Sequence, residues 1–216
     1  MHRNKFILLF VLLFQACIQN FPQCPMDTLT LKKECSETLK QSEKESMIQL
    51  LGAAALVSGN SSGSTLSGQA LEFYNILVQY RSNGTYTLTS GTVRSFLNAS
   101  KCSGTTSNHS ALNRAAQKHT ENMIRYNFFS HTGQDGSTPT DRVKAEGLNV
   151  GTGENIAAGY SSAEAVFDGW WNSSGHRKNM ETCTYTHVGI GYAEKSSINA
   201  SASYNQYWTN VFATIK

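Results

Sequence analysis

The chain has 216 residues, of which 39% are hydrophobic and only 15% are charged, and its formal net charge is +3. This length accommodates one globular domain together with additional segments. A net charge this small argues against a nucleic-acid partner and against a membrane anchor built from basic residues.

The first residues have the pattern of an export signal. The basic stretch "MHRNK" precedes "FILLFVLLF", an apolar run of nine residues. A membrane-spanning helix needs about 20 apolar residues, so the run fits a cleaved signal better. We assign residues 1–19 to a signal peptide and expect a secreted, extracellular protein with no membrane span. The cleavage point stays open, because Ala16 suits a peptidase and Phe14 does not. A lipid anchor on Cys17 is the less favoured alternative.

Four further cysteines indicate two disulfides in an exported chain, with three possible pairings. We expect Cys24 to pair with Cys35 and Cys102 with Cys183, because the first two lie in a separate N-terminal segment. Free thiols are less compatible with export. A zinc site built from cysteines is disfavoured, since the sequence has no C-x-x-C.

Asparagines in the pattern N-x-S/T are candidates for N-glycosylation in a eukaryotic source. A chain rich in Asn, Ser and Thr also produces this pattern by chance. The candidates are Asn60, Asn83, Asn98, Asn108, Asn172 and Asn199.

The chain divides into an N-terminal part and a larger domain. Residues 20–57 are compatible with one or two helices, and residues 58–68 form a Ser/Gly-rich linker. The literal G-x-S-x-G at 59–63 lies in this low-complexity stretch, so we interpret it as a chance match. Residues 69–216 carry the regular patterns of a folded domain.

Within this domain, apolar spacing and capping residues predict four helices, and late alternation of apolar and polar residues predicts two antiparallel strands. The helices are expected over 70–82, 110–127, 137–147 and 161–173, and the strands over 187–195 and 204–216. Residues 83–107 are expected to form a long loop with a turn near 93–97. This arrangement is α+β rather than alternating βαβ.

Seven stretches in order carry a resemblance to a known family. They read "NILVQYR", "ALNRAAQKHTENM", "FFSHTGQDGSTPTDRVKAEG", "GENIAAGY", "SAEAVFDGWWNSSGHRKNM", "HVGIGYA" and "YWTNVFA". Together they resemble the CAP superfamily (cysteine-rich secretory proteins, antigen 5 and pathogenesis-related 1 proteins; the SCP domain), in its bacterial-type branch. The resemblance covers about two thirds of the chain. It implies a three-layer α-β-α sandwich with a central antiparallel sheet and a cleft at one end.

Members of that family commonly carry two histidines and two glutamates in the cleft. The resemblance assigns His131, Glu154 and His176 to three of these positions, whereas Asn172 or Ser173 stands where the second glutamate is usual. We expect the three side chains to converge, with Glu154 at the start of a strand. Asn155, Trp171, Asn172 and Ser173 are expected to line the same cleft.

Two imidazoles and one carboxylate form the ligand set of many catalytic zinc sites. The missing second glutamate and the lack of an evident general base favour weak binding of zinc or another divalent metal over a committed enzyme. A purely structural role, in which Glu154 and His176 hold the cleft loops together, has equal support.

Other polar residues have simpler expected roles. His119, on the apolar face of its helix, should be a packed core histidine, and His187 should be exposed. Arg142 and Asp135 should form a local pair beside His131.

Two classes of function remain. We favour a secreted binding or interaction module whose cleft receives an extracellular peptide, lipid or protein. The alternative is a metal-dependent peptidase that uses His131, Glu154 and His176. Lipid or sterol binding, as the resemblance implies for some members, is a weaker third possibility.

Overall fold

The computed structural model describes residues 65–97 and 101–216. These residues belong to a unit that extends over Ser62–Lys216. The expected signal peptide, N-terminal helical segment, most of the linker, the Cys24–Cys35 disulfide and the glycosylation candidates Asn60 and Asn98 lie outside the described residues.

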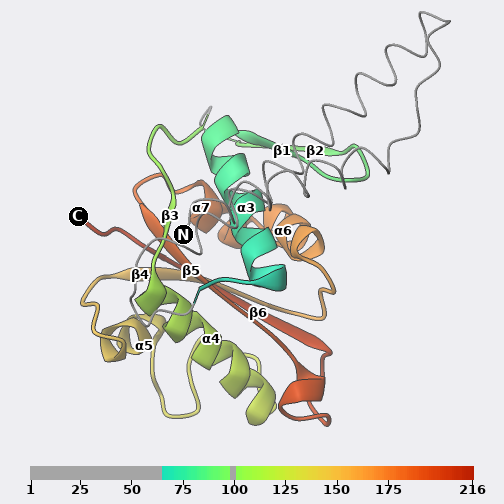
Figure 1. Ribbon diagram of the computed structural model, residues 1–216, viewed down its shortest axis with the longest axis vertical. Coiled ribbons are helices and arrows are strands. Elements are labelled where there is room, and N and C mark those ends of the chain that lie inside the picture. The colour runs from blue at the N-terminus through green and yellow to red at the C-terminus, as the bar shows by residue number, and fades with distance from the viewer. Residues whose placement is uncertain (1–64, 98–100) are drawn as a thin grey trace, which may run out of the picture. The chain divides into compact units, whose positions relative to one another are not determined.

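A four-stranded sheet forms the middle layer of this unit (Figure 1). Its order is β3-β5-β6-β4, with β3 (Ser107–Asn108), β5 (His187–Glu194), β6 (Gln206–Ala213) and β4 (Thr152–Ala158). The β5–β6 and β6–β4 pairs are antiparallel, and the short β3 is parallel to β5. β4 therefore pairs on one side only and is an edge strand.

Helices cover both faces of the sheet, so the expected α-β-α sandwich is confirmed. On one face lie α3 (Gly68–Asn83), α6 (Ala163–Asn172) and α7 (Ser174–Glu181). On the other face lie α4 (Ser110–Arg125) and α5 (Pro139–Ala145). A hairpin of β1 (Thr85–Thr87) and β2 (Val93–Ser95) follows α3, and the short 3-10 helix η1 (Lys195–Ser197) follows β5.

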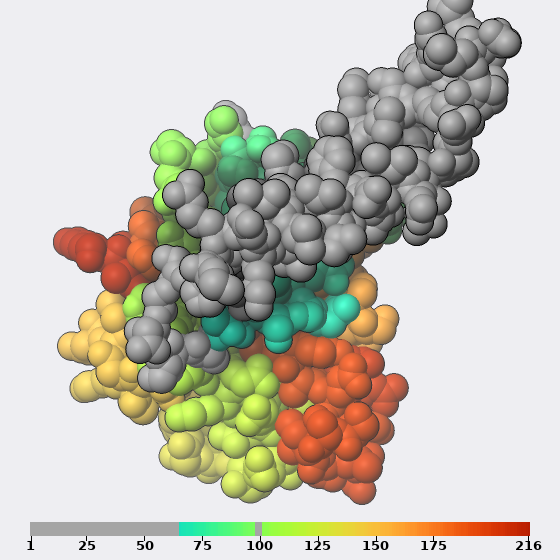
Figure 2. Space-filling view, viewed as in Figure 1, coloured from blue at the N-terminus to red at the C-terminus, as the bar shows by residue number. Residues whose placement is uncertain are grey.

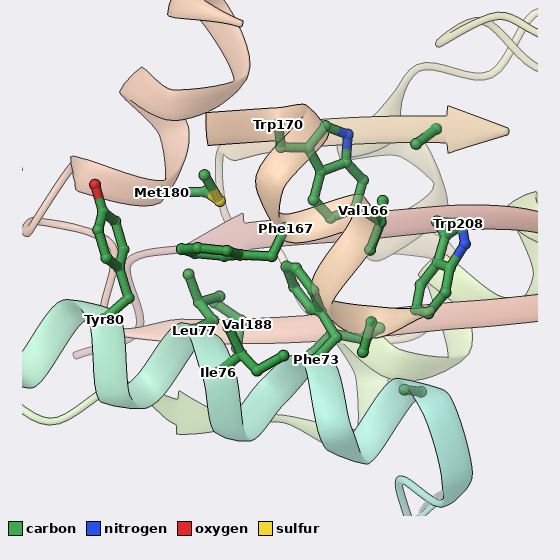
Figure 3. Packing of buried hydrophobic residues seen from close by; sticks show 14 of the residues in the cluster. Phe73, Ile76, Leu77, Tyr80, Val166, Phe167, Trp170, Met180, Val188 and Trp208 are labelled. Carbon is green, nitrogen blue, oxygen red and sulfur yellow. The ribbon is translucent and has the colours of Figure 1, made fainter. Parts of the chain in front are cut away.

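The larger core lies between α3, α6 and the sheet (Figure 3). Phe73 and Leu77 are four residues apart on α3 and so share the face that meets Phe167, Trp170 and Trp208. The ring of Phe73 packs edge-on against Trp170, with centroids 5.1 Å apart. Each such side chain contributes about 1.5–3 kcal/mol when fully buried. This packing fixes α6, and with it one side of the candidate site.

Arg81, at the end of α3, anchors the region after α7. Its guanidinium is buried and donates to backbone carbonyls of Met180, Thr182 and Tyr185, at 2.6–3.3 Å. The carbonyls that a helix C-terminus leaves unpaired are natural acceptors for a cation. Burial lowers the pKa of Arg81 to about 10. The guanidinium thus ties α3 to the end of α7.

The disulfide between Cys102 and Cys183 lies beside this anchor, because the N–H of Cys102 donates to the carbonyl of Arg81 at 2.8 Å, and the prediction of this pairing is confirmed. Its cysteines are separated by 81 positions, so the cross-link closes a long loop and restricts the unfolded chain. Together with Arg81, it holds the segment after α7 against the end of α3.

Several short elements were not expected. The β1–β2 hairpin has three-residue strands, too short for a visible alternation, and occupies the stretch expected to be a loop. β3 has two residues only. α7 buries a single residue, Met180, so its sequence has no apolar stripe that would predict a helix.

On the opposite face, α4 packs unusually close to β5. A β-carbon at Gly189 would overlap the backbone of Leu112 and Asn113, and one at Gly191 would crowd the backbone of Ala116. Glycines at these two positions therefore set the distance between α4 and the sheet. The C-terminal part of α4 also lies beside the segment after η1 (Figure 2), where Asn199 donates to the carbonyl of Ile124.

We predict that Gly189→Ala lowers the free energy of unfolding by about 1–3 kcal/mol or more, because the added methyl group has no space. Gly151→Ala is the matched control, since a β-carbon there meets no atom within 4 Å. Urea denaturation of both variants measures the difference. Equal stability of the two variants would contradict the close approach of α4.

Candidate functional site

The candidate site is organised by β4, on which neighbouring side chains point to opposite faces of the sheet. Glu154 points toward the face covered by α4 and α5, and Asn155 toward the face covered by α7. Both residues are buried. One edge strand thus contributes a polar side chain to each side of the site.

On the first side, the carboxylate of Glu154 accepts two hydrogen bonds. Oε1 lies 2.8 Å from Nδ1 of His131, and Oε2 lies 2.7 Å from Nη2 of Arg142. The Glu154 side chain is only 2% exposed, whereas that of His131 is 52% exposed. Since an ionised carboxylate can only accept, Nδ1 of His131 carries the proton and Nε2 is left for other partners. Glu154 therefore orients His131.

Helix α5 brings Arg142 to this position. Thr138 and Asp141 form a capping box at the start of α5, which fixes where the helix begins. Arg142 also donates to the carbonyls of His131 and Ser137, at 3.1 and 2.9 Å. The expected local pair between Arg142 and Asp135 is wrong: Glu154 is the ion-pair partner, and the Asp135 carboxylate accepts from the backbone N–H of Ser137.

His119 fixes the position of the loop that carries His131. This residue is 1% exposed, and its Nε2 lies 2.9 Å from the carbonyl oxygen of Ser130. Burial is the main cause that lowers the pKa of His119, so the neutral ring that donates to Ser130 is favoured. The prediction of a packed, hydrogen-bonded core histidine is confirmed.

On the second side, Asn155 binds α7. Its Nδ2 donates to the backbone carbonyl of His176 at 3.0 Å, and its Oδ1 accepts from Asn179 at 2.8 Å. Asn179 also donates to the backbone carbonyl of Glu154 at 3.2 Å. Burial, followed by the nearby charge of His131, lowers the pKa of His176 below its usual value. The two histidines are thus electrostatic neighbours that come from opposite sides of β4.

Between the two sides lies a cleft with a volume of about 550 Å³. We call the segment that supplies 129–131 the histidine-loop wall, and the residues of α6, α7 and Tyr160 the helix wall. The edge of β4 that does not pair with β6 forms the floor. The lining residues are Phe129, Ser130, His131, Ile156, Ala157, Ala158, Tyr160, Gly169, Trp170, Ser173 and His176.

The predicted site residues separate into three groups. His131, His176 and Ser173 line the cleft, whereas Glu154 and Asn155 support its two walls from beneath. Trp171 and Asn172 do not line this cleft.

The ring of Trp171 instead packs against the guanidinium groups of Arg94 and Arg177, whose Cζ atoms lie 4.6 and 4.9 Å from the ring centroid. Asn172 is exposed and donates to the carbonyl of Asp168. Adjacent residues on a helix point about 100° apart. Of the two neighbouring tryptophans, Trp170 and Trp171, it is Trp170 that lines the cleft.

Sequence reasoning missed the aromatic residues and the strand edge. Phe128 packs into the core while Phe129 is 49% exposed, so the pair "FF" contained a usable signal. Both residues lie in the loop after α4, which ends at Arg125. Tyr160 is 36% exposed at the other side of the cleft.

The geometry limits the donors available to a metal ion. Among residues 65–97 and 101–216, no three His, Cys, Asp or Glu side chains form a group that could hold one. Glu154 is engaged by His131 and Arg142, so the cleft itself offers two imidazoles. His187, which was expected to be exposed, is half-buried, and its ring lies 5.9 Å from that of His109, outside the cleft.

In three of the four described glycosylation candidates, the side-chain nitrogen Nδ2 donates a hydrogen bond. Nδ2 of Asn108 donates to Asn113, that of Asn172 to the carbonyl of Asp168, and that of Asn199 to carbonyls at the end of α4. A glycan attaches to this nitrogen, so the exposed Asn83 is the most accessible of the four. Glycosylation itself stays a prediction.

Residues 75–212 match the Cysteine-rich secretory protein family, CAP, and the chain belongs to this family. The match includes every described part of the cleft. The resemblance inferred from the seven sequence stretches is thereby confirmed.

Individual relatives cover smaller regions. The uncharacterized protein YkwD of Bacillus subtilis (strain 168) is 40% identical over 88 residues, which are 40% of this chain and 34% of that protein. The chain thus matches about a third of the length of this relative.

Among solved structures, an extracellular protein containing a SCP domain from Bacillus anthracis str. Ames is 29% identical, with a TM-score of 0.44 over 51% of this chain and 34% of the other. An outer surface protein from Borrelia burgdorferi is 15% identical, with a TM-score of 0.51 over 71% of this chain and 99% of the other. The second likeness shows the fold alone. Within the described residues, no helix has the length and apolar character of a membrane span.

Proposed function

We propose that the protein is an exported binding module whose cleft receives part of an extracellular peptide, lipid or protein. The observation that carries the proposal is the cleft itself. Its volume of about 550 Å³ lies within the range of ligand sites, and aromatic side chains and two imidazoles face it. The signal-like N-terminus and membership of the Cysteine-rich secretory protein family support export.

The state of Glu154 favours binding over hydrolysis. A metal-dependent peptidase would need this carboxylate as a ligand or as a general base. Both of its oxygens instead accept hydrogen bonds from residues that build the wall, His131 and Arg142. Of the two residues that stand where the second glutamate is usual, Asn172 is exposed outside the cleft lining, and Ser173 lines the cleft but carries no carboxylate. The side chains that face the cleft are thus suited to contact a ligand.

The cleft supplies part of the ligand set that a divalent metal ion needs. His131 and His176 would hold it through imidazole nitrogens, and Glu154 would orient His131 as carboxylates commonly orient metal-binding histidines. Two protein ligands bind more weakly than the three or four of dedicated zinc sites. Weak, exchangeable binding is therefore the form that these residues support.

We predict that filling the cleft abolishes ligand binding. Ser173→Trp places a large side chain in the cleft, whereas Ser174→Trp adds the same group at the next, exposed position. Zinc chloride, peptides from a random library and phosphatidylcholine vesicles are the probes, tested by titration calorimetry or surface capture. At least one probe should bind wild type and Ser174→Trp but not Ser173→Trp. If every probe that binds the wild-type protein binds Ser173→Trp equally well, the binding surface lies elsewhere.

For zinc, we predict that His131→Ala and His176→Ala each remove the weak binding measured by calorimetry, because one imidazole alone does not retain the ion. His187→Ala is the control, since it removes a histidine from the pair with His109 outside the cleft. Loss of binding in His187→Ala, with binding retained in the two cleft variants, would assign the ion to that other pair.

A further inference from the structure

The floor of the cleft is a strand edge with unused backbone groups. The carbonyl of Glu154 accepts from Asn179, and that of Ile156 accepts from the indole of Trp170 at 3.1 Å. Both carbonyls therefore point away from β6. The N–H of Gly159 donates to the carbonyl of Gln206, so this residue points toward the β6 strand.

Backbone groups alternate in direction along a strand, with the N–H and C=O of one residue on the same side. Ile156 and Ala158 consequently direct their N–H and C=O groups away from β6. Within the described part of the chain, the N–H of Ile156 and both groups of Ala158 have no hydrogen-bond partner. Both residues line the cleft.

We propose that this edge binds an extended peptide, which adds a strand beside β4 within the cleft. The inference rests on the proposed function and names its ligand class. An extended backbone supplies the alternating acceptors and donors that Ala158 and the N–H of Ile156 require, and strand addition of this kind is a recurring mode of peptide recognition. A lipid chain or sterol ring offers no such series of hydrogen-bonding groups.

The mouth of the cleft adds side-chain contacts suited to a peptide. Phe129 and Tyr160 line the cleft from opposite walls. Tyr204 is 47% exposed, and its ring lies 6.4 Å from that of Phe129. Exposed aromatic side chains in one place are typical of binding surfaces. Successive side chains of an extended peptide point in opposite directions, so they would contact the two walls in turn.

The edge geometry allows one residue to be tested without breaking the sheet. Ala158→Pro removes an N–H that points away from β6, and proline is tolerated on the free side of an edge strand. Ala158→Ser keeps the N–H and is the matched control. The probe is a 12-residue peptide selected from a random library on the wild-type protein, with Ser173→Trp used for counter-selection. We expect Ala158→Pro to weaken its binding about tenfold or more and Ala158→Ser to leave it unchanged.

Aromatic contacts are tested separately. Phe129→Ala should weaken binding of the same peptide, whereas Tyr126→Ala removes an aromatic residue that is 56% exposed outside the cleft lining and should not. Circular dichroism and thermal unfolding establish that each variant is folded.

A scan of the peptide by single N-methylation does not depend on the fold of any variant. Strand pairing uses every second peptide N–H, so affinity should fall at alternate positions and persist between them. A scan without alternation, or unchanged binding to folded Ala158→Pro, would overturn the inference. Failure to select any peptide sensitive to Ser173→Trp would also overturn it, while zinc or vesicle binding sensitive to that variant would leave the proposed function intact.

Discussion

The site depends on the alternation of side chains along β4. Because neighbouring residues of a strand point to opposite faces, Glu154 reaches the layer of α4 and α5 while Asn155 reaches the layer of α7. The edge between them becomes the floor of the cleft, and each layer contributes one wall with one histidine. A shift of one residue in the pairing of β4 with β6 would exchange the two side chains and separate both walls from their supports. The observed register pairs Glu154 with Val211 and Asn155 with Asn210.

Polar groups are buried on both sides of this strand, and each has a specific reason to be tolerated. Glu154 and Arg142 neutralise one another, with side chains only 2% and 10% exposed. Removing one member of such a pair is costly because the other remains as an uncompensated charge. Arg81 is buried without a carboxylate partner, and its guanidinium donates hydrogen bonds to carbonyl oxygens around the end of α7 instead. These contacts determine the positions of the loops and of α7. Apolar packing between the layers does not determine those positions.

Much of the fold could be predicted because its long elements carry strong patterns. Phe73 and Leu77 mark one face of α3, and Thr138 with Pro139 marks the start of α5. The helix α7 could not be predicted from periodicity, since Met180 is its only buried residue and its position depends on Asn155 and Arg81 from distant parts of the chain. Such long-range contacts cannot be inferred from the local sequence.

For the site, motif resemblance located His131 and His176, which both line the cleft. It could not assign the role of Glu154, because the partner Arg142 comes from another element and only the folded chain brings them together. It also chose the wrong tryptophan for the cleft, since the direction of Trp170 and Trp171 depends on how α6 packs on the sheet. The strand edge was not predicted because the direction of backbone N–H and C=O groups does not depend on which residue occupies a position.

Glu154 and Asn155 each support a different wall of one preformed cleft. Hydrogen exchange measured by mass spectrometry on Glu154→Gln and Asn155→Ala tests it most directly. The first variant should exchange faster over 128–142 and remain protected over 174–181, and the second should show the reverse. Faster exchange over both segments in either variant, or unchanged exchange in both variants, would contradict the account.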